Sequence, residues 1–327
     1  MSSLPKFQTV LQISKNGGPE VLEVVHDAPI PKPQEGEILV KNTHAGVNYI
    51  DTYFRTGLYP SSQFPYILGR EGEGHIVSVG PNTPGYTIGE RVAYTGMATQ
   101  AQYALASTST VTKLPEGLPA GIGAASMIQG LTALTLIRES HHVKSGDSVL
   151  VHAAAGGVGL WLCQLLRAVG AGQIIATAST QEKLELAKEN GATHLINYVE
   201  EDWVQKVKEL GGVIAVFDGV GKSTFEGDLE VLNRKGTLVS FGNASGAVPP
   251  FSIAKLSQKN VKVLRPTLFN YLATKEEFET YANELIDLIK EKKVEVRIHK
   301  EYTLADAQQA HKDIEGRGTT GKLIFKL

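Results

Sequence analysis

The most informative segment of this 327-residue chain reads Val149-Leu150-Val151-His152-Ala153-Ala154-Ala155-Gly156-Gly157-Val158-Gly159. It begins as a short apolar run, which is typical of a buried parallel strand. It then breaks into small residues and continues as a predicted helix, whose apolar face holds Leu162, Leu165, Leu166 and Val169. A strand, a small-residue turn and a helix N-terminus form a pyrophosphate site, because the turn admits the phosphates and the helix start offers free N–H groups.

The usual fingerprint of such a turn is G-x-G-x-x-G. Ala154 stands where the first glycine would be, while Gly156 and Gly159 fill the other two places. A glycine pattern alone is a weak signal, and the strand before it and the helix after it make it specific. A tight strand-to-helix turn that binds nothing is the alternative interpretation.

The composition argues against several other classes of protein. Apolar residues make up 42% of the chain and charged residues 20%, which is typical of a globular protein. The net charge of -2 gives no electrostatic reason to expect nucleic acid or an anionic membrane as the main partner. No apolar run reaches the length of a membrane span, and the N-terminus carries no secretory signal. Because the single cysteine, Cys163, cannot form an internal disulfide, we expect a cytoplasmic protein.

The texture of the sequence changes along the chain. Up to about residue 118, short strand-like runs alternate with Gly/Pro turns, which predicts a partly open β-barrel. From Ser148 onward strands and helices alternate, which predicts a doubly wound parallel sheet. We therefore expect an α/β protein with a barrel domain over residues 1–125 and 266–327 and a Rossmann domain over residues 126–265.

The end of the next predicted strand bears on the choice of nicotinamide cofactor. An NAD site normally places a carboxylate about 20 residues after the glycines, where it holds the ribose 2′-hydroxyl. Here the strand over residues 174–178 is followed by Ser179, and Lys183 comes in the first turn of a helix. A hydroxyl and an ammonium suit a 2′-phosphate, so we expect NADPH rather than NADH. Glu182 should point away from this site, and a merely solvated Lys183 is the alternative.

Four segments carry a resemblance to a known family: residues 45–53, 153–159, 240–246 and 265–268. Together they resemble the medium-chain dehydrogenase/reductase superfamily, and within it the zeta-crystallin-type quinone oxidoreductases. The resemblance runs nearly end to end. It implies a GroES-like barrel domain, a Rossmann domain, and a cleft between them for NADPH and its acceptor.

The zinc alcohol dehydrogenases of the same superfamily differ at the positions that bind metal. They carry a cysteine where this chain has Asn48, and a Gly-His-Glu motif where this chain has Gly69-Arg70-Glu71. Tetrahedral zinc needs thiolate or imidazole ligands held together. We therefore expect an enzyme with no metal.

The resemblance also implies roles for individual residues. At the reacting end it implies Asn48, Asp51 and Tyr53 as catalytic residues, with Tyr53 and Asn48 donating hydrogen bonds to an acceptor oxygen. For Asp51 the alternative is a helix-start carboxylate favoured by the helix dipole. The residues implied for the cofactor are Gln129, Gly156, Gly157, Val158, Gly159, Ser179, Lys183, Tyr198, Phe241, Gly242, Asn243, Ala244, Arg265 and Arg317.

The activity that the resemblance implies is reduction of a quinone by NADPH. Reduction of the C=C bond of a 2-alkenal or enoyl thioester on the same fold is the alternative, and it depends more strongly on a proton donor such as Tyr53. An RNA-binding or structural crystallin-like role belongs to another class, and the sequence carries no basic stripe or aromatic RNA-binding signature to support it. The strand predicted over residues 261–264 would lie at a sheet edge, and because such edges are usually covered we expect a homodimer.

Overall fold

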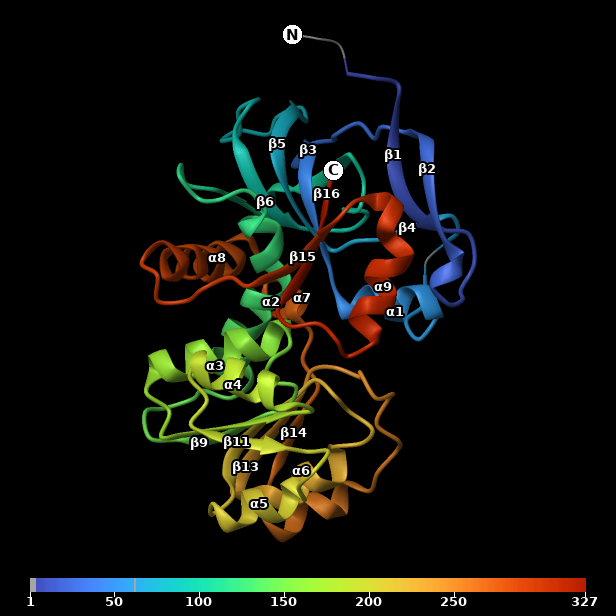
Figure 1. Ribbon diagram of the computed structural model, residues 1–327. Coiled ribbons are helices and arrows are strands. Elements are labelled where there is room, and N and C mark those ends of the chain that lie inside the picture. The colour runs from blue at the N-terminus through green and yellow to red at the C-terminus, as the bar shows by residue number, and fades with distance from the viewer. Residues whose placement is uncertain (1–3, 62) are drawn as a thin grey trace. The chain divides into compact units, whose positions relative to one another are not determined.

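The computed structural model describes residues 4–61 and 63–327, which form two compact units (Figure 1). Unit 1 runs to Ile128 and also contains Leu272–Lys290 and Val296–Leu327, while unit 2 contains Gln129–Tyr271 and Glu291–Glu295. The domain boundaries expected above, after residues 125 and 265, stay a prediction.

Two sheets form unit 1. The strands of the larger sheet are β3 (Glu37–Val47), β5 (Glu71–Val79), β6 (Arg91–Thr95), β7 (Tyr103–Ser107), β8 (Val111–Lys113), β15 (Ile298–Tyr302) and β16 (Lys322–Lys326). Their order is β15-β16-β3-β5-β6-β8 with β7 paired to β3, and the pairs are antiparallel except β15 with β16. The smaller sheet has the order β2-β1-β4 and consists of β1 (Phe7–Ile13), β2 (Leu22–Pro29) and β4 (Tyr66–Ile67).

Alternating apolar residues of the larger sheet point to one side and form a hydrophobic core. Ile38, Val40, Ile76, Val92 and Tyr94 are fully buried and contact one another in it. The helices of unit 1 are α1 (Tyr49–Thr56), α8 (Lys275–Lys290) and α9 (Ala307–Glu315), and α2 (Ile122–Thr135) carries the chain from unit 1 into unit 2. The short 3-10 helices of unit 1 are Pro19–Val21, Thr108–Thr110 and Leu304–Asp306.

A six-stranded parallel sheet forms unit 2 (Figure 1). Its strands are β9 (Ser148–Val151), β10 (Gln173–Ala178), β11 (His194–Asn197), β12 (Val213–Asp218), β13 (Leu232–Ser240) and β14 (Lys262–Leu264). Its helices are α3 (Gly157–Val169), α4 (Gln181–Glu189), α5 (Trp203–Glu209), α6 (Phe225–Val231) and α7 (Leu268–Tyr271), with a π-helix at Leu136–Ser140 and a 3-10 helix at Ile253–Gln258. In Figure 1, α3 and α4 cover one face of the sheet and α5 and α6 the other.

The strand order of unit 2 is β11-β10-β9-β12-β13-β14. The chain therefore winds one way from β9 and returns to the other side of β9 at β12, as in a doubly wound sheet. The predicted combination of a β domain with a parallel-sheet domain is confirmed. Ligands bind such sheets at the carboxyl ends of the strands where the winding reverses, which is where the glycine turn after β9 lies.

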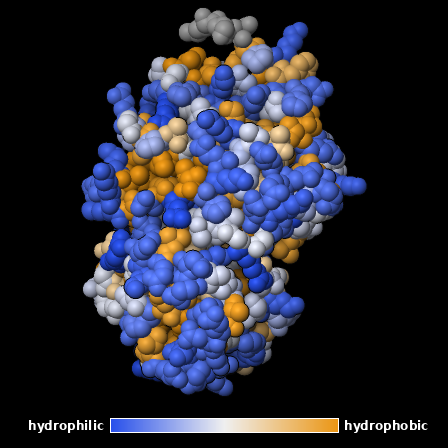
Figure 2. All heavy atoms as spheres, in the orientation of Figure 1, coloured by the Kyte–Doolittle hydropathy of each residue, from blue (hydrophilic) through white to orange (hydrophobic). Residues whose placement is uncertain are grey.

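The surface fits the composition. Figure 2 shows that hydrophilic residues cover most of the visible face, with apolar patches between them. Among residues 4–61 and 63–327, no helix is both long and apolar enough to span a bilayer.

A buried arginine fastens helix α1 to helix α9. Arg55 is 2% exposed, and its Nη2 and Nη1 donate to the two carboxylate oxygens of Glu315 at 2.7 and 3.0 Å. Nη1 also donates to Nδ1 of His311 at 3.1 Å, and Nε donates to the carbonyl of Gly17 at 3.2 Å. Burial and the nearby guanidinium lower the pKa of His311 to about 3, so this imidazole stays neutral and accepts the bond.

We expect Arg55→Met to lower the free energy of unfolding by about 2–4 kcal/mol, because it leaves Glu315 without its partner inside a packed helix contact. Urea unfolding measures this change. The control is Lys188→Met, which removes an exposed ion pair with Glu185 and should change the free energy by less than about 0.5 kcal/mol. Equal losses in the two variants would contradict the structural role of Arg55.

Candidate active site

The glycine turn after β9 is shaped for a phosphate. Helix α3 begins at Gly157 with Gly156 as its N-cap, and within the described chain no side chain caps this end. A Cβ on Gly159 would run into the carbonyl of Ala153, so only glycine lets helix and turn pack this closely. The N–H groups of the first turn are therefore left for an anion.

Gln129 supports the same interpretation. It lies against the turn so closely that a Cβ on Gly157 would overlap its side-chain amide. The residue is only 9% exposed, and its Oε1 accepts no hydrogen bond from any residue that the structure describes. Buried polar atoms in proteins normally have a hydrogen-bond partner. The amide oxygen of Gln129 therefore fits a site beside the glycine turn in which a bound ligand donates the missing hydrogen bond.

The two residues predicted for the 2′-phosphate, Ser179 and Lys183, follow β10, and Tyr198, predicted for the adenosine end, follows β11. Thr180 caps helix α4 by accepting a hydrogen bond from the backbone of Lys183 at 3.4 Å, while Ser179 and Lys183 are half-buried. The backbone N–H of Tyr198, at the end of β11, donates to the carbonyl of Ala178 at 3.2 Å. The ring of Tyr198 is 40% exposed, so it can receive a flat group beside Ser179.

A second turn follows β13 at the same edge of the sheet. Phe241 donates from its backbone to Asp218 at 2.8 Å, and a Cβ on Gly242 would run into the backbone of Gly219. Arg265, just after β14, donates from Nη1 to the carbonyls of Ser240 and Gly242 at 2.8 and 3.0 Å. Arg265 thus holds the turn that contains Phe241, Gly242, Asn243 and Ala244.

In unit 1 a buried ion pair lies at the start of helix α1. Lys322 is 1% exposed and Glu71 is fully buried, and Nζ of Lys322 donates to Oε1 of Glu71 at 2.5 Å. The same ammonium donates to Oδ1 of Asn48 at 2.6 Å, and Nδ2 of Asn48 donates to Oε1 of Glu71 at 2.7 Å. The other oxygen of Glu71 accepts from the backbone of Ile128 at 2.6 Å.

Asp51 lies in the first turn of α1, next to this ion pair. Its Oδ2 accepts from the backbone N–H of Asn48 at 2.9 Å and from Nε2 of Gln100 at 3.1 Å. Asp51 is 1% exposed, and in the described part of the chain its Oδ1 has no partner. Burial raises the pKa of Asp51 to about 6, although the Asn48 hydrogen bond, Lys322 and Arg70 all oppose the rise.

Tyr53, two residues further along α1, joins an aromatic cluster. Its ring centroid lies 5.6 Å from that of Tyr49 and 5.1 Å from that of Tyr59, and the residue is 8% exposed. The structure therefore brings Asn48, Asp51 and Tyr53 together on one short helix, and their catalytic roles stay a prediction. Arg317 lies in an exposed turn after α9, with φ of 57°. Its role at the cofactor also stays a prediction.

No sequence pattern predicts a role for Glu71, Lys322 or Gln100. Glu71 belongs to the Gly69-Arg70-Glu71 motif, which was considered only for its missing zinc ligand. Lys322 opens the last strand, and nothing around it in the sequence signals a buried charge. All three are fully or almost fully buried next to Asn48 or Asp51.

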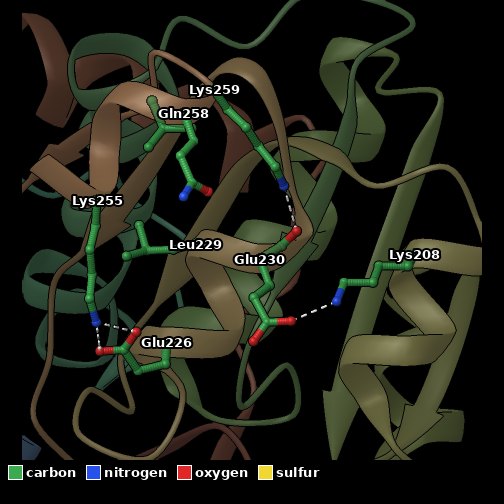
Figure 3. A pocket seen from close by; sticks show the side chains of 8 residues that line it. Lys208, Glu226, Leu229, Glu230, Lys255, Gln258 and Lys259 are labelled. Carbon is green, nitrogen blue, oxygen red and sulfur yellow. Dashed lines mark hydrogen bonds and ion pairs between the residues drawn. The ribbon is translucent and has the colours of Figure 1, made fainter.

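A separate hollow on unit 2 does not resemble a binding site. It measures about 430 Å³ and lies beside α5, α6 and the 3-10 helix at Ile253–Gln258 (Figure 3). Its charged side chains bind one another: Lys255 pairs with Glu226 at 2.7 Å and Lys208 with Glu230 at 2.6 Å. Because these exposed charges are already paired, the candidate binding residues are those at the strand ends of unit 2 and, separately, those at α1 of unit 1.

Comparisons with known proteins agree with this geometry. An alcohol dehydrogenase GroES-like domain matches residues 34–137, and a zinc-binding dehydrogenase domain matches residues 157–290. A probable quinone oxidoreductase of Schizosaccharomyces pombe is 44% identical over 97% of this chain and 96% of its own, and quinone oxidoreductase 1 of Escherichia coli is 42% identical over 97% and 99%. The solved structure of the Escherichia coli quinone oxidoreductase complexed with NADPH covers 98% of this chain and 100% of its own, with 39% identity and a TM-score of 0.93.

One of the matched domains is named for zinc binding, but the side chains near α1 do not suit a zinc ion. Asn48 and Arg70 offer an amide and a guanidinium instead of a thiolate and an imidazole. The nearby carboxylate of Glu71 is bound by Lys322, whose ammonium would repel a metal cation at this point. Across the residues described, no three His, Cys, Asp or Glu side chains form a metal-binding group.

The buried Asp51 carboxyl should make the free energy of unfolding depend on pH. The pKa of Asp51 is about 6 in the folded chain and higher than in the unfolded chain, so the folded chain binds the carboxyl proton more tightly. Ionisation of Asp51 therefore destabilises the fold, and this destabilisation is fully present above pH 6. We expect Asp51→Asn to raise the free energy of unfolding at pH 7.5 by about 1–3 kcal/mol, since the amide oxygen can still accept from Asn48. The gain should shrink steadily as pH falls below 6.

Urea unfolding between pH 5 and 8 measures this effect. The control is Asp306→Asn, which alters an exposed helix cap whose pKa is lowered by hydrogen bonds from Thr303, so it should give no gain at pH 7.5. A loss of stability in Asp51→Asn that is the same at every pH would contradict the expected burial of the charge.

Proposed function

The chain belongs to the quinone oxidoreductases of the medium-chain dehydrogenase/reductase superfamily, and from that premise we propose that it reduces quinones with NADPH and without a catalytic metal. The observation that carries the proposal is the uncapped, glycine-lined start of α3 at the point where the strand order of unit 2 reverses. When bound, NADPH supplies the hydride.

The residues of unit 2 bind the cofactor. The backbone of Gly156, Gly157, Val158 and Gly159 receives the pyrophosphate, and Gln129 fills the floor of the turn. Ser179 and Lys183 supply a hydroxyl and an ammonium to the 2′-phosphate, and the exposed ring of Tyr198 covers the adenosine end. Phe241, Gly242, Asn243 and Ala244 lie along the nicotinamide, held by Arg265. One residue of unit 1, Arg317, adds a cation.

The residues of α1 orient the acceptor. Tyr53 donates its hydroxyl to an acceptor oxygen, and the surrounding rings pack against a flat conjugated molecule. Asn48, whose Oδ1 and one N–H are held by Lys322 and Glu71, keeps its second amide N–H for the same oxygen. A quinone is already electrophilic and its reduced oxygens take protons from solvent, so the site needs no strong acid.

Steady-state kinetics test the proposal. Chelator-treated protein should oxidise NADPH with 9,10-phenanthrenequinone at an undiminished rate, and should oxidise NADH much more slowly. Lys183→Ala should lower the preference for NADPH over NADH about 10-fold, because it removes a charge-assisted contact to the 2′-phosphate. Lys188→Ala, an exposed lysine on the same helix, is the matched control and should leave the preference unchanged.

Two results would contradict this function. Turnover that stops after chelation would mean that a metal takes part. Turnover of 2-hexenal but of no quinone would assign the chain to C=C reduction, and in that case Tyr53→Phe should abolish most of the activity because the α-carbon needs a proton donor.

The proposed assembly is a homodimer joined along β14. This strand pairs with β13 on one side, and in the described chain no strand pairs with its other side. An open edge of a sheet is usually covered or paired. We expect light scattering at micromolar concentration to give about twice the 35.2 kDa of one chain. A mass of one chain would refute the dimer.

The cytoplasm is the proposed compartment. The support is the single cysteine, Cys163, a buried free thiol that can form no internal disulfide. Fractionation of cells that express a tagged full chain tests this.

A further inference from the structure

Arg70 differs from the other buried cations of the chain. In the described residues three lysines or arginines are buried: Arg55, Arg70 and Lys322. Arg55 lies 2.7 Å from a carboxylate oxygen of Glu315 and Lys322 lies 2.5 Å from one of Glu71. Arg70 is 9% exposed and forms no ion pair within the part of the chain that the structure describes.

Neutral aromatic groups hold the Arg70 side chain. Its Nη2 donates to the hydroxyl of Tyr66 at 2.9 Å, and its Cζ lies 4.2 Å from the centroid of the Phe54 ring. Tyr66 and Phe54 are themselves stacked, with centroids 5.5 Å apart and an interplanar angle of 23°. A guanidinium has five N–H donors, so most of those of Arg70 bind no described residue.

Such an arrangement is costly unless something else supplies the missing charge. A buried ion without a counter-ion is strongly destabilising, and proteins normally pair it or leave it for a ligand. The ring of Phe54 and the hydroxyl of Tyr66 fix the fork in one orientation, so a ligand finds it already in place. A planar fork with several free N–H groups is suited to carboxylate or sulfonate oxygens.

The aromatic cluster connects Arg70 with the proposed acceptor site. Phe54, which Arg70 covers, lies 5.8 Å from the ring of Tyr59, and Tyr59 lies 5.1 Å from the ring of Tyr53. The charge of Arg70 also reaches Asp51, since it lowers the pKa of that carboxyl against the larger effect of burial. All of these residues belong to unit 1.

We propose that Arg70 is a specificity-determining residue that binds an anionic substituent of the acceptor, so that the chain prefers flat quinones carrying a carboxylate or sulfonate. The aromatic cluster binds the ring system and the guanidinium binds the acidic group. This inference rests on the proposed quinone reduction and identifies the class of quinone.

The test compares two matched acceptors, 1,2-naphthoquinone and 1,2-naphthoquinone-4-sulfonate, with NADPH. We expect Arg70→Met to raise KM for the sulfonate about 10- to 100-fold and to change KM for the neutral quinone less than about 3-fold, because one charge-assisted contact is lost. The kcat values should change little. Arg70→Lys should recover part of the preference, since it keeps the charge and loses the fork.

Thermal unfolding separates this role from a structural one. Arg70→Met removes an unpaired buried charge, so its Tm should stay the same or rise. Arg91→Met is the control: it removes the partner of the buried Glu73 carboxylate, so it should lower Tm and leave the preference for the sulfonate unchanged. A lower Tm in Arg70→Met with both KM values unchanged would overturn the proposal.

An equilibrium binding measurement tests the role of Arg70 independently of quinone reduction. If the unmodified protein reduces neither quinone, the proposed function fails, and calorimetry with anthraquinone-2-sulfonate still tests Arg70. Binding that weakens about 10-fold or more in Arg70→Met supports the anionic subsite. Equal binding by both proteins refutes it.

Discussion

The start of helix α1, where we propose that the acceptor binds, depends on the contact between Lys322, Glu71 and Asn48. These residues come from the last strand, the strand β5 and the cap of α1, and Lys322 lies 251 positions from Glu71 in the sequence. A buried ion pair of this kind persists only when its remaining donors and acceptors are satisfied. Here the Asn48 amide and the Ile128 backbone satisfy them, so the C-terminal strand fixes where α1 begins.

The position of α1 in turn fixes the side chains that it carries. Asp51 caps the same turn that Asn48 opens, and Tyr53 follows within one turn of the helix. Arg55 then fastens the other end of α1 to α9 through Glu315. The helix is short, with eight residues, and isolated helices of that length are unstable in water. Its order therefore comes from the two buried cations at its ends.

The sequence was informative where structure is local and silent where it is not. The parallel sheet of unit 2 follows from hydrophobic runs and turns. Ser179, Tyr198 and Arg265 each follow one of its strands, so they lie at the same end of the sheet, where the carboxyl ends of parallel strands are found. The partners of Asn48 could not be found this way. Lys322 stands at one end of a run of three apolar residues with Lys326 at the other, and Glu71 stands between Arg70 and Gly72, so neither neighbourhood marks a buried charge. A charge is buried when strands that are distant in sequence pack around it, so no local sequence pattern predicts its burial.

The environment of Arg70 could not be predicted from the local sequence either. In the sequence Arg70 was notable only because a zinc-binding relative would carry histidine there. That no carboxylate of the described residues pairs with it is a property of the packed unit. The two proposed binding regions, one in each unit, also differ in kind. The proposed cofactor region of unit 2 depends on the absence of a Cβ atom at Gly157 and Gly159 and on backbone N–H groups that suit any pyrophosphate. The proposed acceptor region depends on buried charges, which bind by sign and geometry, so we expect changes in these side chains to alter the choice of acceptor and to leave cofactor binding unchanged.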